Sequence, residues 1–221
     1  MEPAIARKVA AELGINIEFV VREFWELAVL EVLLGTGVGN RLVFKGGTAL
    51  RLAYGSPRFS DDLDFSITRD VSYREFMSAV QRVVRRYPEL ELTDLAEKRQ
   101  TLLAEFRVRD SAIERNVRQV VEVSRRGPGS LEKELRLLSS PCSPLRVLAL
   151  VVTSEAIWRE KLAAMKARKA PRDLFDLWFL GQTLGRKLPD DAPEFDPRVL
   201  RRELRMYLPR KFYPVVEELA R

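Results

Sequence analysis

The sequence predicts an α/β or α+β core with helical additions at both ends. Near both ends, apolar residues recur mostly at three- and four-residue steps, which is typical of amphipathic helices. In the middle, short runs of alternating apolar and polar residues, typical of half-buried strands, take turns with helical segments. This order indicates a sheet packed against helices, although it does not name a fold by itself.

The first half of the chain supplies most of the predicted core. Ile17, Val20, Val21 and Phe24 begin a broad apolar helix face that ends at the Gly35–Asn40 stretch. In the segment 62–67, every second residue is apolar, which predicts a strand. The expected elements are helices at 4–13 and 16–34, a strand at 42–44, a helix at about 48–54, a turn at 55–60, the strand at 62–67 and an amphipathic helix at 72–87.

The second half continues with strands and ends in helices. Thr153 is a plausible N-cap for a helix, and Pro171 restarts a helix that Gly181 or Gly185 ends. The expected elements are strands at 101–109 and 118–124, a Gly-Pro-Gly turn at 127–129, a strand at 147–152, helices at 154–169 and from 171, and one or two short basic helices after Pro197.

Composition excludes several kinds of chemistry. The 221 residues contain no histidine, so Ser-His-Asp and Cys-His catalysis and His-containing metal sites are excluded. The single cysteine, Cys142, cannot form an internal disulfide, which fits a reducing cytoplasm. The longest apolar stretch, 147–152, is far shorter than the roughly 20 residues of a membrane span. We therefore expect a soluble cytoplasmic protein, and its net charge of +6 suggests an anionic partner such as nucleic acid.

Two aspartates on the predicted strand at 62–67 suggest a metal site. Residues two apart on a strand point to the same face with Cα atoms roughly 6 to 7 Å apart, so Asp62 and Asp64 can reach one ion. Mg²⁺ is a hard cation that proteins hold with one or two carboxylates together with substrate phosphates. An ordinary solvated strand edge has the same pattern and stays an alternative.

The sequence Gly46-Gly47-Thr48 lies shortly before these aspartates and supplies the complementary part. Glycines let the backbone approach an anion closely, the free N–H groups of a helix start attract it, and the Thr hydroxyl adds a donor. A plain strand-to-helix turn is the alternative. Together, an anion-binding turn and a two-carboxylate strand are what metal-assisted phosphoryl or nucleotidyl transfer requires.

Two segments resemble the signature motifs of the AbiEii/AbiGii-toxin-type nucleotidyltransferases, a branch of the DNA polymerase β-like superfamily that includes the MenT toxins. The first reads FKGGTALRLAYGSPRFSDDLDFSI and the second EKLAAMKARKAPRDLFDLWFL. The resemblance covers roughly residues 36–182. It implies an α+β fold with a mixed sheet, an NTP substrate, Mg²⁺ (or Mn²⁺) as cofactor, and transfer of a nucleotide, in some members to the tRNA 3′ end. Some members are toxins paired with an antitoxin protein.

The resemblance assigns roles to residues of the first segment. Metal binding falls to Asp62 and Asp64, and nucleotide binding to Gly46, Gly47, Thr48, Arg58 and Ser60. Related enzymes use a third carboxylate on a later strand to bind a second metal or to activate the attacking hydroxyl. Glu122 is the best match for it and Glu105 is the rival, while either can also be an ordinary strand-face charge.

The second segment supplies basic and acidic side chains. Lys161 and Arg168 are seven residues apart, about 700° around a helix, so they share a face. By the resemblance, Lys161 neutralises the triphosphate, Asp176 orients it or contacts nucleotide, Arg168 and Arg172 bind nucleotide, and Asp173 is structural. Alternatively, Arg168 or Arg172 pairs with Asp176 and simply pins two helices together.

The predicted function is therefore metal-dependent transfer of an NMP from an NTP to an acceptor hydroxyl, with RNA as the expected acceptor. A two-metal nuclease is an alternative, but it does not explain the Gly-Gly-Thr turn or Lys161. A non-catalytic nucleotide- or RNA-binding regulatory protein is another, against which both aspartates argue. The expected organisation is N-terminal helices at 1–35, a nucleotidyltransferase core at 36–152, and a helical region at 153–221 that completes the active site.

Overall fold

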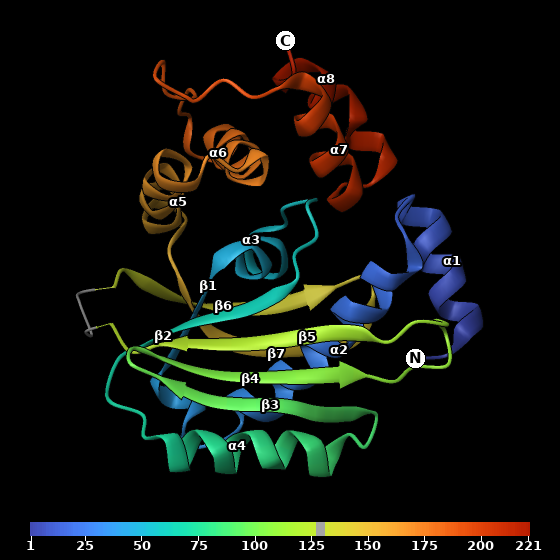
Figure 1. The fold of residues 1–221 in the computed structure, drawn as a ribbon, viewed down its shortest axis with the longest axis vertical. Coiled ribbons are helices and arrows are strands. Elements are labelled where there is room, and N and C mark those ends of the chain that lie inside the picture. Colours follow the sequence, from blue (N-terminus) through green and yellow to red (C-terminus); the bar gives the residue numbers. More distant parts are fainter. Residues whose placement is uncertain (127–130) are drawn as a thin grey trace.

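A single mixed sheet organises the part of the chain that the computed structural model describes, residues 1–126 and 131–221. The Gly-Pro-Gly turn expected at 127–129 lies outside these residues. The strands are β1 (Leu42–Lys45), β2 (Asp62–Ile67), β3 (Leu90–Lys98), β4 (Thr101–Val108), β5 (Val117–Ser124), β6 (Lys133–Ser140) and β7 (Ser143–Val152). Their order in the sheet is β3-β4-β5-β2-β1-β7-β6 (Figure 1). Because β2 is parallel to β5 and antiparallel to β1, the sheet is mixed, which confirms the predicted α+β class.

Helices precede, interrupt and follow the sheet, as predicted. They are α1 (Pro3–Leu13), α2 (Ile17–Leu34), α3 (Gly46–Tyr54), α4 (Tyr73–Arg86), α5 (Ser154–Arg168), α6 (Pro171–Leu184), α7 (Pro197–Tyr207) and α8 (Tyr213–Leu219). The expected cap of α5 is confirmed, because the Thr153 hydroxyl accepts a hydrogen bond from the Ala156 amide. Gly185, in a left-handed conformation, ends α6. No helix among the described residues is long and apolar enough to cross a membrane.

Two strands were not expected from the sequence, and both lie at the edges of the sheet. β3 carries mostly polar, partly exposed residues, and β6 exposes the apolar side chains of Leu135 and Leu137 by 59% and 51%. An edge strand that buries little of either face lacks the regular alternation by which a strand is recognised. For a similar reason β7 begins at Ser143, four residues before the apolar run that predicted it.

The apolar side chains form two main cores. The larger core unites α2 and α4 with the sheet, and the second joins α5–α8 to Val43, Leu50 and Val152. Figure 1 shows α5–α8 gathered at the end of the molecule opposite α4, with α3 between them and the sheet. The aromatic residues of α6 belong to this second core, since Phe175 is fully buried and both Trp178 and Phe179 pack on it.

Candidate functional site

Three carboxylates share one face of the central strands. Asp64 of β2 lies opposite Lys45 of β1 and, on its other side, opposite Glu122 of β5. Residues opposite each other in neighbouring strands project to the same face, and so do residues two apart. Asp62, Asp64 and Glu122 therefore project together. Among the described residues, however, no three Asp, Glu, Cys or His side chains are already grouped closely enough to hold a metal ion.

The two glycines before α3 come unusually close to these acids. Gly46 has a positive φ of 79°, and a Cβ atom there would lie 2.4 Å from Asp64 Oδ2. A Cβ atom on Gly47 would lie 2.6 Å from both Arg58 Nη2 and Ser60 Oγ. A side chain at either position would force these groups to shift, so the lack of side chains lets the backbone of the turn lie against the carboxylate strand.

A cleft of about 250 Å³ opens between this turn, β2 and helices α5 and α6. Its walls carry carboxylates, cations and exposed backbone at the start of α3. The predicted site residues that line it are Gly46, Gly47, Arg58, Ser60, Asp62, Asp64, Lys161, Arg168 and Arg172. The two sequence segments, about 100 residues apart, thus meet at one place.

Two residues that were predicted to contact or orient the nucleotide do not line the cleft. Thr48 is fully buried, and its hydroxyl donates a hydrogen bond of 2.6 Å to the carbonyl oxygen of Asp62. It therefore holds the start of β2 and does not face the cleft. Asp176 is also fully buried and lies behind the cleft wall, so it can orient other side chains but does not touch a nucleotide.

The rival candidates for the third carboxylate differ in their surroundings. Glu122 neighbours Asp64 directly across the β2–β5 pair. Glu105 of β4 lies one strand farther away and forms an ion pair of 2.7 Å with Arg118. Glu122 is close enough to raise the pKa of both Asp62 and Asp64, whereas Glu105 already has a basic partner. The surroundings of the two residues favour Glu122.

The carboxylates on this face of the sheet repel one another, and the nearby cations offset this only in part. Burial, followed by the charges of Asp62 and Glu122, raises the pKa of Asp64 to about 6, although Lys45 and Lys161 oppose the rise. Burial and the charges of Asp61 and Glu122 likewise raise the pKa of Asp62. Such crowding of acids is typical of a site that takes up a cation.

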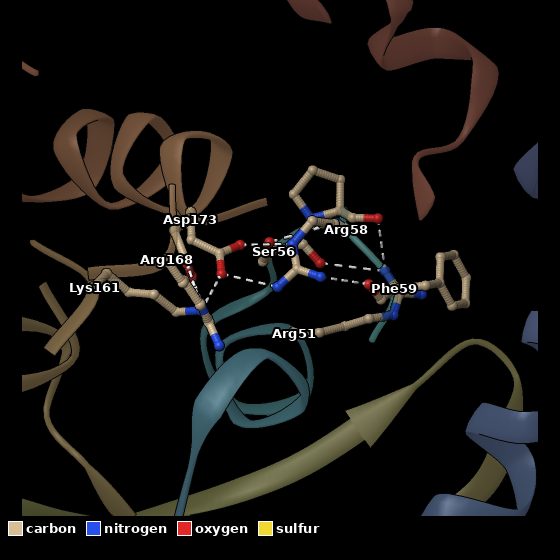
Figure 2. Close-up of polar contacts among 9 residues, drawn as sticks. Arg51, Ser56, Arg58, Phe59, Lys161, Arg168 and Asp173 are labelled. Atoms are coloured by element: carbon tan, nitrogen blue, oxygen red, sulfur yellow. Dashed lines mark hydrogen bonds and ion pairs between the residues drawn. The ribbon is translucent and has the colours of Figure 1, made fainter. Parts of the chain in front are cut away.

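A network of buried ion pairs supports the opposite wall of the cleft. The Lys161 ammonium lies 3.0 Å from Asp173 Oδ1 and 2.6 Å from Asp176 Oδ2. Arg168 donates two hydrogen bonds to Asp173, of 2.6 and 2.7 Å, and Arg58 donates two to Asp176, of 2.7 and 2.8 Å. Figure 2 shows Lys161 and Arg168 reaching Asp173 beside the Arg58 guanidinium. Asp176 thus has Arg58 and Lys161 as partners, and the alternative pairing with Arg168 or Arg172 is wrong.

The charges in this network stabilise one another. Burial alone would raise the pKa of Asp176, but the Arg58 guanidinium and the Lys161 ammonium outweigh it and hold that pKa below its usual value. Burial likewise opposes the charge on Arg58, and Asp176 more than offsets this and raises the pKa of the guanidinium. Three cations share two carboxylates, so the wall keeps a net positive charge toward the cleft.

A second arginine fixes the loop that carries Arg58. Arg51 of α3 forms an ion pair with the buried Glu23 of α2 and donates hydrogen bonds to the carbonyl oxygens of Ser56 and Pro57. Its guanidinium carbon also lies 3.4 Å from the centre of the Phe59 ring (Figure 2). Arg58 therefore sits on a loop that is bound to two helices.

The sequence reasoning missed three residues that line the cleft, Lys45, Glu160 and Ala164. Lys45 lies opposite Asp64, and its ammonium makes no hydrogen bond or ion pair within residues 1–126 and 131–221. An ammonium group without a protein partner is available to an anionic ligand. Its position directly before the Gly-Gly pair was the signal that could have identified it.

Comparisons with known proteins agree with this geometry. The family model described as nucleotidyl transferase AbiEii toxin, type IV toxin–antitoxin system, matches residues 29–212. The structure of JHP933 from Helicobacter pylori is similar with a TM-score of 0.57 and 26% identity, over 76% of this chain and 68% of that one. The MenT4 nucleotidyltransferase toxin from Mycobacterium tuberculosis has the same fold, with a TM-score of 0.60 and 24% identity over 91% of this chain and 68% of that one. No functionally curated protein matches the sequence.

Proposed function

The chain belongs to the AbiEii family of nucleotidyltransferase toxins of type IV toxin–antitoxin systems, and we propose that it transfers an NMP from an NTP to a hydroxyl of RNA. The tRNA 3′ end is the proposed acceptor. One observation carries the proposal: the carboxylates of β2, the glycine turn and Lys161 surround the same cleft. This combination suits a triphosphate bound next to a divalent cation.

The cationic wall and the glycine turn are proposed to hold the triphosphate. Amide groups at the start of α3 point toward an anion, and the glycines allow it to come close. Two buried carboxylates hold the Lys161 ammonium at the cleft, and the side chains of Lys45 and Arg172 have no hydrogen-bond or ion-pair partner among the described residues. Arg58 uses its guanidinium on Asp176 and on the carbonyl oxygen of Phe59, so its proposed role is to position the wall.

The β2 carboxylates fit a hard divalent cation such as Mg²⁺ or Mn²⁺. Both are oxygen donors on one face of a strand, and burial followed by the neighbouring charges of Asp62 and Glu122 raises the pKa of Asp64. Such ions are commonly held by one or two carboxylates and completed by substrate phosphates and water. We propose Asp62 and Asp64 as the ligands, with Glu122 as the third carboxylate. The ion would neutralise charge that develops on the phosphate oxygens.

The proposed reaction is a displacement at the α-phosphorus. The acceptor oxygen forms a bond to the α-phosphorus, the bond to the bridging oxygen breaks, and pyrophosphate leaves with the bonding electrons. The acceptor hydroxyl gives its proton to a carboxylate, for which Glu122 is the candidate. The remaining residues act by positioning and by charge, as is general for such transfers.

The family membership also implies partners. An antitoxin protein is the expected partner of a type IV toxin. We propose that the chain acts in the cytoplasm, where NTPs and tRNA occur together. The division into helices at 1–35, a core at 36–152 and a completing helical region at 153–221 is part of the same proposal, and it is supported by the contribution of α5 and α6 to the cleft.

Incubation of the protein with each NTP, Mg²⁺ and total RNA tests this function. A species that gains the mass of one or more NMP units, and does so only with NTP, is the expected result. Asp64→Ala should abolish the gain while circular dichroism shows an intact fold. RNA that shortens without NTP would instead favour the nuclease, and undiminished transfer by Asp64→Ala would refute the site.

A further inference from the structure

Two hollows adjoin the cleft and have no role in holding the triphosphate. One, of about 440 Å³, shares Asp62 with the cleft and extends to Arg118 and Phe19. The other, of about 430 Å³, shares Arg172 with the cleft and extends to Arg202. Met206 and Tyr207, at the end of α7, line both hollows. The end of α7 therefore stands between two spaces that each border the reaction centre.

The chemistry of transfer requires the acceptor and the pyrophosphate to lie on different sides of the α-phosphorus. In a displacement at phosphorus, the attacking and leaving oxygens lie roughly in line, so the acceptor must enter opposite the pyrophosphate. The groups proposed to hold the triphosphate, namely the glycine turn and Lys161, lie on the cleft side of Asp62. The hollow that shares Asp62 contains neither the glycine turn nor Lys161, so an acceptor placed there would reach Asp62 without displacing the triphosphate.

Exposed basic and apolar side chains line the hollows, next to the acidic residues Glu18, Asp61, Asp62 and Glu203. The side chains of Arg172 and Arg202 make no ion pair or hydrogen bond within the described part of the chain, and the Arg118 side chain is 63% exposed despite its pairing with Glu105. Met206 exposes 52% of its surface, an unusually high fraction for a large apolar residue. Proteins bind single strands by combining basic groups for the phosphates with flat or apolar side chains against the bases.

The position of Tyr207 is fixed from several sides. Its hydroxyl donates a hydrogen bond of 2.6 Å to Asp61 Oδ2, and its ring packs edge-on against Phe19 with the ring centres 5.3 Å apart. Its carbonyl oxygen accepts a hydrogen bond from the Phe59 amide. Asp61 directly precedes Asp62, so the end of α7 is tied to the start of the carboxylate strand. A base held at Tyr207 would have a defined position relative to the metal ligands.

Resting on the proposed function, we propose that the 3′-terminal nucleotides of a single-stranded RNA acceptor occupy these two hollows. Met206 separates successive bases, and Arg202 and Arg118 contact the phosphates. Two small hollows divided by a projecting side chain suit separate unpaired nucleotides, whereas a duplex needs a continuous open surface.

Direct binding tests the acceptor site. Fluorescence anisotropy would follow a fluorescein-labelled single-stranded RNA of about 12 nucleotides and a blunt duplex of the same sequence. Arg202→Glu should weaken binding of the single strand by about tenfold and lower the slope of log affinity against log salt by about one. Met206→Ala should weaken it by about fivefold with little change in that slope, because it removes a base contact. Arg198→Glu, also exposed on α7 but away from the hollows, is the matched control and should bind as the wild type does.

The outcomes separate this proposal from the proposed function. Equal affinity of the wild type, Arg202→Glu and Met206→Ala for the single strand, or an equal loss in Arg198→Glu, would overturn the acceptor site even if NMP transfer is observed. The acceptor site would also be overturned if the wild type preferred the duplex. The same holds if Arg202→Glu transferred NMP to a protein at an undiminished rate. Binding of the single strand that depends on Arg202 and Met206 supports the acceptor site. If the same preparation showed no NMP transfer, this would refute only the proposed function. Binding of the NTP, measured by equilibrium dialysis, should be unchanged in both variants.

Discussion

Arg58 and Asp176 lie 118 residues apart in the sequence and form a two-point ion pair behind the cleft, with distances of 2.7 and 2.8 Å. Both side chains are buried, and Asp176 also faces the Lys161 ammonium at 2.6 Å. The pair therefore connects the loop before β2 to α6 and fixes the lysine proposed to face the triphosphate. The same carboxylate therefore takes part in the packing of α6 and in the proposed chemistry.

Asp176→Asn should lower both stability and activity. Removing one partner of a buried ion pair leaves an uncompensated charge and costs about 3 to 5 kcal/mol. Urea unfolding should show this loss, and NMP transfer per folded molecule should fall because Lys161 loses one of its two anchors. The double variant Arg58→Met/Asp176→Leu replaces the pair by apolar groups and should regain stability without regaining activity. Recovery of both properties together would contradict a positioning role.

The choice of the third carboxylate is testable with a pair of variants. Glu122→Gln keeps the shape of the side chain but removes its charge, and the rate of NMP transfer should fall by about 100-fold or more if Glu122 accepts the hydroxyl proton. Glu105→Gln, on the next strand of the same sheet, should stay within a few-fold of the wild-type rate. Single-turnover measurements at saturating NTP and RNA separate this effect from binding. The reverse ranking would assign the role to Glu105.

The sequence predicted the parts of the site that depend on local spacing. The period of two in β2 places Asp62 and Asp64 on one face, and the glycine pair predicts a close approach at the start of α3. Local spacing carried no information on the pairing of Arg58 with Asp176, because the loop before β2 meets α6 only in the folded chain. It also misplaced Thr48, whose hydroxyl binds a carbonyl oxygen of β2, a partner set by how α3 lies on the sheet.

Gly46→Ala should separate a steric effect from backbone strain. Gly46 and Gly55 have nearly equal positive φ angles, 79° and 77°, so alanine should cost about 1 to 2 kcal/mol of folding free energy at either position. Only at Gly46 would the new methyl group meet a carboxylate, since nothing lies within 4 Å of the corresponding position at Gly55. Gly46→Ala should therefore reduce NMP transfer strongly, and Gly55→Ala should leave it nearly unchanged in folded protein. Equal activities of the two variants would show that the close approach to Asp64 has no role.

Glu26 should make the protein less stable as pH rises. Its side chain on α2 is 1% exposed, and Oε1 has no hydrogen-bond partner among the described residues. Burial, and then the charge of Glu23, raise the pKa of Glu26 well above its usual value, although Arg22 and Arg51 oppose the rise. The folded state then binds the proton more tightly than the unfolded chain does. The contribution of Glu26 is fully present below the unfolded pKa of about 4.3 and is lost as pH rises through the folded pKa.

Glu26→Gln removes this titration and should therefore raise the free energy of unfolding at pH 7. The gain is about 1.4 kcal/mol for each pH unit between the unfolded pKa and the folded pKa, and it stops growing where the folded pKa exceeds pH 7. Urea unfolding between pH 4 and pH 8 measures the difference, which should vanish at the acid end. Glu12→Gln, at a side chain that is 62% exposed, is the control and should follow the wild type at every pH. A constant difference between Glu26→Gln and the wild type across this range would mean that packing, and not the buried charge, sets the effect. A gain that grows with pH would identify Glu26 as a buried acid that the fold tolerates at a cost in stability, on the same helix as Arg22 and Glu23, whose contacts secure the loop before β2.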